Sequence, residues 1–127
     1  MEHYCSTENR DPSGDYLFTL DMSEGISYDA ELYVMSECTP ERFRDFTSVR
    51  LDMDWISPSG GHYCESVYLG GDKIIKSTYF WRQLGGRYRE GMVPSERGVW
   101  TLCVHTDERT IRDYSLSGMG VRLIANR

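Results

Sequence analysis

The chain has 127 residues, of which 39% are hydrophobic and 27% are charged, a balance typical of one folded domain and not of a disordered chain. Its net charge is −6 and its only lysines are Lys73 and Lys76. This argues against nucleic acid as a partner, because binding a phosphate backbone needs clustered basic side chains. No apolar run approaches the length of a membrane-spanning helix.

The first half of the chain shows the alternation of apolar and polar residues that is typical of strands. Residues 1–14 are polar and are predicted to be an N-terminal tail or linker before a folded domain of residues 15–127. Thr39 followed by Pro40 predicts the cap and first position of a helical turn within residues 36–46. Strands are predicted at 15–22, 28–35, 47–56 and 62–69. The last two are joined by the turn sequence SPSGG and are expected to form a hairpin.

The second half continues the pattern less regularly. Strands are predicted at 73–81, 99–105 and 121–125. The glycine-rich segment 83–98 is expected to be irregular and exposed, and 106–120 to be a charged link.

These short strands, separated by turn residues and without long helical periodicity, predict the fold class. We expect an all-β protein with a single antiparallel β-sandwich of about seven to eight strands. Strand spacing alone leaves jelly-roll and immunoglobulin-like topologies open.

The end of the chain carries a further signal. Gly98 opens an aromatic strand, a charged segment with Arg112 follows, and then come Leu116, Gly118 and the closing GVRLI. Upstream, DYLFTLDM, YDAELYVMSE, RDFTSVRLDMDW and SPSGG follow in order. Over about residues 15 to 124 this series resembles the GldH-type gliding-motility lipoprotein family of Bacteroidetes.

The resemblance implies a non-catalytic envelope lipoprotein in the periplasm, anchored to the outer membrane by a lipid outside or near the N-terminus. It implies an accessory or scaffold role in a gliding or secretion-type apparatus, with envelope proteins of the outer membrane as partners. The family lends no catalytic residue, and no cofactor or metal is expected.

The alternative prediction is a glycan-binding β-sandwich module. The segment STYFWRQLGGRYR brings together Tyr79, Trp81, Arg82 and Tyr88. A flat aromatic ring can stack on the face of a sugar while an arginine donates hydrogen bonds to its hydroxyls. These four residues are the predicted ligand-binding site.

Two other groups of side chains have the chemistry for metal binding, disulfide formation or catalysis. His62 with Cys64, and Cys103 with His105, each share one strand face. If their strands were neighbours, the four side chains could bind zinc, or the two cysteines could form a disulfide. The third alternative is that these side chains are not connected to one another. The paired carboxylates Asp52 and Asp54 are of the residue type that glycoside hydrolysis uses. Acids that alternate on a wet strand face usually serve solubility, so no enzyme is expected.

Overall fold

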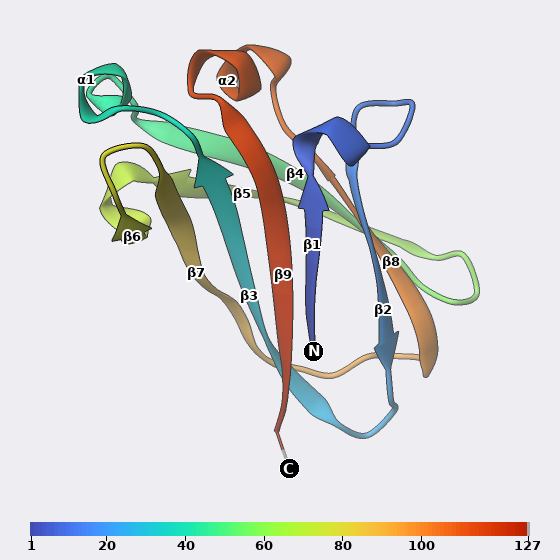
Figure 1. Cartoon of the computed structure of the whole chain (residues 1–127). Coiled ribbons are helices and arrows are strands. Elements are labelled where there is room, and N and C mark those ends of the chain that lie inside the picture. Colours follow the sequence, from blue (N-terminus) through green and yellow to red (C-terminus); the bar gives the residue numbers. More distant parts are fainter. Residues whose placement is uncertain (127) are drawn as a thin grey trace.

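The computed structural model describes residues 1–126 and consists of two antiparallel β-sheets with nine strands (Figure 1). The larger sheet has the order β1 (Glu2–Ser6), β9 (Leu116–Asn126), β3 (Ser27–Ser36), β7 (Arg82–Met92), β6 (Ile74–Ser77). The smaller sheet has the order β2 (Tyr16–Met22), β8 (Gly98–His105), β4 (Ser48–Ile56), β5 (His62–Gly70). The predicted all-β sandwich is confirmed, with nine strands instead of seven or eight. The last residue of the predicted domain, 127, lies outside the described residues.

The strand order identifies the topology as a jelly roll. Apart from the short edge strand β6, each connection crosses from one sheet to the other except the hairpin between β4 and β5. The first and last strands, β1 and β9, pair side by side in the larger sheet (Figure 1). An immunoglobulin-like sandwich distributes its strands differently, so the structure decides between the two topologies left open above.

Alternation along the strands builds the core between the sheets. In β2 every second residue is buried, and β3 and β4 repeat the pattern. The inward side chains that are almost completely buried include Leu20, Leu32, Leu51, Leu84, Leu102 and Val121. Side chains on the other face of the smaller sheet are mostly polar, as predicted for a strand with one wet side, with Leu17, Tyr68 and Val99 as exposed hydrophobic exceptions.

Two short α-helices close one end of the sandwich, α1 (Pro40–Phe43) and α2 (Glu108–Asp113) (Figure 1). Thr39 caps α1, since its hydroxyl accepts a hydrogen bond from the backbone N–H of Arg42 at 3.4 Å. Pro40 occupies the first turn, as the sequence predicted. Two 3₁₀ turns lie elsewhere, η1 (Thr7–Asn9) and η2 (Gly71–Lys73).

The prediction that residues 1–14 form a tail or linker is wrong. Residues Glu2–Ser6 are strand β1, which pairs antiparallel with β9, and the N-terminal amine donates to the carbonyl of Leu123 at 3.1 Å. An edge strand buries few side chains, and here only Cys5 is buried. The apolar alternation that marks an inner strand is therefore missing from this segment.

The segment 83–98 was also predicted wrongly as irregular. Most of it belongs to β7, the strand that pairs with β3 on one side and β6 on the other. Gly85 permits close approach of β7 to the backbone of β3 instead of forming a loop. The predicted strand 73–81 is shortened to the exposed edge strand β6, and the predicted link 106–120 contains α2 and the start of β9.

Among residues 1–126, no helix is long and apolar enough to cross a membrane.

Candidate functional site

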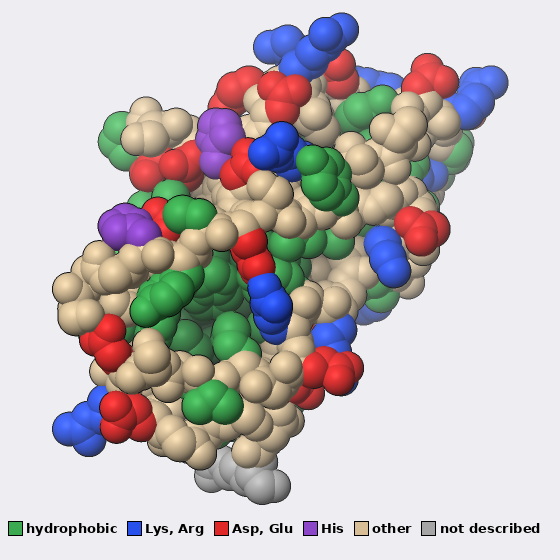
Figure 2. Space-filling view, turned by 180° about the vertical axis from the view of Figure 1, so that it is seen from behind, with side chains coloured by type: hydrophobic (Ala, Val, Ile, Leu, Met, Phe, Trp, Pro, Cys, Tyr) green, Lys and Arg blue, Asp and Glu red, His purple; other side chains and the backbone are tan. Residues whose placement is uncertain are grey.

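A cleft of about 320 Å³ opens on the side of the sandwich where β5 of one sheet faces β7 of the other. We call it the aromatic cleft. Its main lining residues are Trp55, Tyr63, Glu65, Tyr88, Arg89 and Trp100. Figure 2 shows the hollow with hydrophobic side chains on its walls and floor.

The alternation of inward- and outward-facing residues along the strands decides where these aromatic rings lie. Trp55 on β4 and Trp100 on β8 point inward and are only 5% and 6% exposed, so they form the floor. Tyr88 reaches in from β7, its ring parallel to that of Trp55 with 6.5 Å between centroids. Tyr63 on β5 is 53% exposed and lies against Trp100 at 6.0 Å.

The ring polar atoms at the floor have partners. The indole N–H of Trp55 donates to the hydroxyl of Tyr88 at 3.3 Å, and that of Trp100 donates to the carbonyl of Glu96 at 3.0 Å. These bonds fix the rings before any ligand arrives, so little side-chain freedom is left to lose on binding.

One ion pair lies at the edge of the cleft. Arg89 donates to Oε2 of Glu65 from the opposite sheet, and its guanidinium lies 5.4 Å from the ring centre of Tyr88. The other carboxylate oxygen, Oε1 of Glu65, is buried and accepts no hydrogen bond from the described residues. An unpaired buried acceptor costs free energy, and a hydroxyl or N–H of a ligand would satisfy it.

A second hollow of about 460 Å³ adjoins the cleft along the same two strands. We call it the polar hollow. It shares Glu65, Tyr88 and Arg89 with the aromatic cleft, so the two form one groove with the ion pair in its middle. Gly85 and Gly86 of β7 also line the polar hollow and bring no side chains into it.

The four predicted ligand-binding residues do not come together. Tyr88 lines the cleft, but Arg82 lies six residues earlier on β7, roughly 20 Å away along the strand. Arg82 is buried and donates to the carbonyl of Cys38 at 2.5 Å, so its charge serves the fold. Tyr79 and Trp81 lie in the turn before β7, where the hydroxyl of Tyr79 donates to Glu41.

The cleft residues that sequence reasoning missed are Trp55, Tyr63, Glu65 and Trp100. Alternation correctly assigns both tryptophans to the inner face of the sandwich. It gives no signal that this flank of the sandwich is open, because openness depends on the distance between two strands far apart in sequence.

His62, Cys64, Cys103 and His105 do not meet at one metal, because β4 lies between β5 and β8. Cys64 and Cys103 both flank Asp54 of β4, two strand spacings or about 10 Å apart. The disulfide, one of the three alternatives left open above, is therefore excluded by the fold, and all four cysteines are free thiols.

Each Cys–His pair instead contacts one aspartate on the outer face. Asp15 accepts from the Cys103 thiol at 3.4 Å and pairs with Nδ1 of His105 at 2.8 Å. Asp54 accepts from the Cys64 thiol at 3.4 Å and pairs with Nδ1 of His62 at 2.8 Å. Burial, and then the hydrogen bond to Asp15, raise the pKa of Cys103 to about 12.

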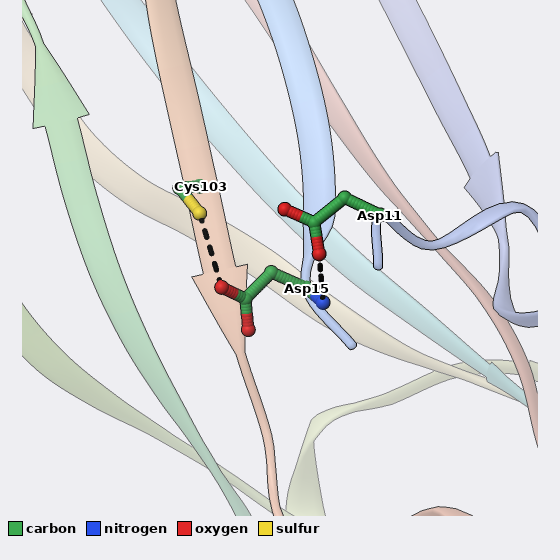
Figure 3. A group of neighbouring side chains, drawn as sticks. All are labelled: Asp11, Asp15 and Cys103. Carbon is green, nitrogen blue, oxygen red and sulfur yellow. Dashed lines mark hydrogen bonds between the residues drawn. The ribbon is translucent and has the colours of Figure 1, made fainter. Parts of the chain in front are cut away.

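The residues best placed to hold a metal are Asp11, Asp15 and Cys103, whose donor atoms lie within 4.8 Å of one another (Figure 3). One Asp11 oxygen is already engaged, since it accepts from the backbone N–H of Asp15 at 2.8 Å. Hydrogen bonds within the group account for this arrangement.

No protein-family model matches the chain, and no curated protein does. Among solved structures, the chain is similar to the enzymatically active domain of tailspike protein 4 of bacteriophage CBA120. The identity is 12% and the TM-score 0.38, over 88% of this chain and 13% of that chain. A likeness at this TM-score carries no inference about function.

Proposed function

We propose that the protein is a carbohydrate-binding β-sandwich module and that the aromatic cleft is its binding site. The observation that carries the proposal is the combination of four aromatic rings with the unpaired buried oxygen of Glu65. A sugar presents C–H groups on its faces and hydroxyls at its edge, so it needs both kinds of contact.

The contacts available in the cleft match this chemistry. Tyr63 offers half-exposed ring surface, and Trp55 and Trp100 offer an apolar floor behind it. The Glu65 oxygen can accept a hydrogen bond from a hydroxyl, and the Arg89 guanidinium can donate one. Hydrophobic pockets with a few convergent polar groups are the usual form of small-ligand sites.

The proposal is of binding and not of hydrolysis. Glycoside hydrolysis uses two carboxyl groups on either side of the scissile bond. Of the described residues that line the cleft, only Glu65 carries a carboxyl group. Asp52 and Asp54 lie on the outer face of β4, where Asp52 pairs with Arg50 at 2.8 Å.

The test is titration of the chain with a glycan panel, followed by variants. Tyr63→Ala is expected to weaken binding about 3- to 10-fold, the range for loss of one aromatic contact. Tyr79→Ala is the matched control, because Tyr79 is as exposed, at 55%, but lies outside the cleft. If the loss followed Tyr79 instead of Tyr63, the cleft would not be the site.

Tryptophan fluorescence locates the ligand independently. Trp55 and Trp100 line the cleft, whereas the third tryptophan, Trp81, does not. A ligand in the cleft is expected to change the emission equally in the wild type and in Trp81→Phe. A signal that disappears with Trp81 would contradict the proposed site.

The second candidate is the envelope scaffold that the resemblance to GldH-type lipoproteins implies. It is favoured by the edge strand β6, where Ile74 and Ile75 are 41% and 51% exposed beside Phe80 at 72%. An apolar sheet edge can pair with a strand of a partner. Cys5 belongs to β1 and its side chain is buried, so its thiol is not exposed for lipidation in this fold.

Cross-linking in the native organism tests this candidate. Repeated recovery of outer-membrane or secretion-apparatus proteins, lost in Ile75→Asp, would support a scaffold that acts through β6. Recovery that is unchanged by Ile75→Asp would exclude β6 as the binding edge.

A further inference from the structure

The groove formed by the aromatic cleft and the polar hollow is long. It follows the inward face of β5 from Tyr63 through Glu65 and Val67 to Leu69, which corresponds to about 20 Å. A single sugar ring fills only one part of such a groove. The site therefore has room for several units of a linear chain.

The two ends of the groove differ in chemistry. The aromatic cleft is walled by rings, whereas the polar hollow is lined by Lys73, Arg87 and Arg89, with Glu65 as the one carboxylate among the described residues that line it. These cations gather in one place on a chain whose net charge is −6. Two of these cations are held by acidic side chains, Arg89 by Glu65 and Arg87 by Asp29 and Glu90, so the positive charge left for an anionic group is that of Lys73.

The partners of these cations show which of them is available. Arg89 is paired with Glu65, and Arg87 lies 3.1 Å from Glu90 and 3.6 Å from Asp29. Lys73, at the end of η2, makes no salt bridge with the described residues. Lys73 is therefore the cation best placed to pair with an incoming anion.

We infer that the groove binds a linear acidic oligosaccharide, with one sugar ring stacked in the aromatic cleft and a carboxylate- or sulfate-bearing unit in the polar hollow beside Lys73. This inference rests on the proposed carbohydrate-binding function and adds its ligand class. The unpaired oxygen of Glu65, midway along the groove, accepts a hydrogen bond from a hydroxyl of the oligosaccharide. The Glu65–Arg89 pair therefore contacts the middle of the bound oligosaccharide.

The chain offers a matched control for the charge at this site. Its two lysines are Lys73, which lines the hollow, and Lys76, which is exposed on β6 and does not. The experiment is titration calorimetry of the wild type, Lys73→Ala and Lys76→Ala with oligouronates of two to six units and with neutral oligosaccharides of the same lengths.

The expected result has three parts. Affinity rises with length up to the span of the groove, oligouronates bind about fivefold tighter than neutral chains, and added salt removes this preference. Lys73→Ala lowers oligouronate affinity about threefold, in the range of an exposed ion pair, and leaves neutral chains unaffected. Lys76→Ala changes neither.

The failures of the two proposals are distinguishable. Equal affinity for acidic and neutral chains, or equal effects of Lys73→Ala and Lys76→Ala, overturns the acidic ligand class while the carbohydrate site stands. Affinity independent of length overturns the extended groove. If no oligosaccharide of either class binds, the proposed function fails with it.

Discussion

Two adjacent glycines of β7, Gly85 and Gly86, differ in a way that yields a quantitative prediction. Both have positive φ angles, +155° and +154°. A Cβ atom added to Gly85 would lie 2.1 Å from the carbonyl oxygen of Leu32 and 2.7 Å from Cα of Tyr33, both in the backbone of β3. A Cβ atom on Gly86 would meet nothing within 4 Å.

The two alanine substitutions therefore share one cost and differ in another. The unusual φ costs about 1–3 kcal/mol at either position. At Gly85 the methyl group must also push apart two paired strands, and such overpacking adds about 1–3 kcal/mol. We expect Gly85→Ala to lower the free energy of unfolding by about 2 kcal/mol more than Gly86→Ala does.

Urea unfolding followed by circular dichroism measures the difference. A gap of about 2 kcal/mol corresponds to roughly 6–10 °C in Tm for a chain of this size. Equal losses in the two variants would refute the close contact between β7 and β3. Gly86 lines the polar hollow, so the milder variant also shows whether a methyl group there obstructs the ligand.

Three further predictions concern single side chains. Hydrogen bonds from Asn126 and then from a backbone N–H lower the pKa of Asp29. The stabilising contribution of the Asp29 carboxylate is therefore complete above its pKa in the unfolded chain, about 3.8, and is lost as the pH falls through its lower pKa in the folded protein. Asp29→Asn is expected to make the free energy of unfolding fall less steeply with decreasing pH in this range. The hydrogen bond to Asp54 raises the pKa of the exposed Cys64 thiol, so Asp54→Asn is expected to speed its alkylation several-fold at pH 8, as followed by mass spectrometry. Arg82→Ala leaves a buried carbonyl unpaired and is expected to lower the free energy of unfolding by about 2 kcal/mol in thermal melts, without an effect on the proposed glycan binding of the folded protein.

The inner strands are predictable from the sequence because burial on one face imposes a period of two. Residues 47–56 show this best, since Val49, Leu51, Met53 and Trp55 are all buried in β4. The hairpin to β5 follows from the turn sequence SPSGG, where the N–H of Ser57 donates to the carbonyl of Gly61 at 2.8 Å. Local rules suffice for these elements.

The segments predicted wrongly are those whose structure depends on contacts with a distant part of the chain. The sequence GG at 85–86 has the composition of a turn, yet Gly85 is required by contact with Leu32 more than fifty residues earlier. Strand β1 exists because β9, at the other end of the chain, offers it an edge. No window of neighbouring residues contains that information.

The four residues of the predicted ligand site are separated in the structure for a related reason. Tyr79, Trp81, Arg82 and Tyr88 are close in sequence, but an extended strand carries its ends far apart. The rings that do converge come from β4, β5, β7 and β8. Their convergence depends on strand order, which the alternation pattern leaves undetermined.

The cleft also shows why core and site residues cannot be separated by pattern in this fold. Trp55 and Trp100 are as buried as core residues, yet their rings form the cleft floor. Removing either ring would cost about 3–5 kcal/mol of stability, so loss of binding in such a variant would not identify the site. Tyr63 and Lys73 are exposed and contribute little to the core. Only variants at such positions can separate a loss of binding from a loss of fold.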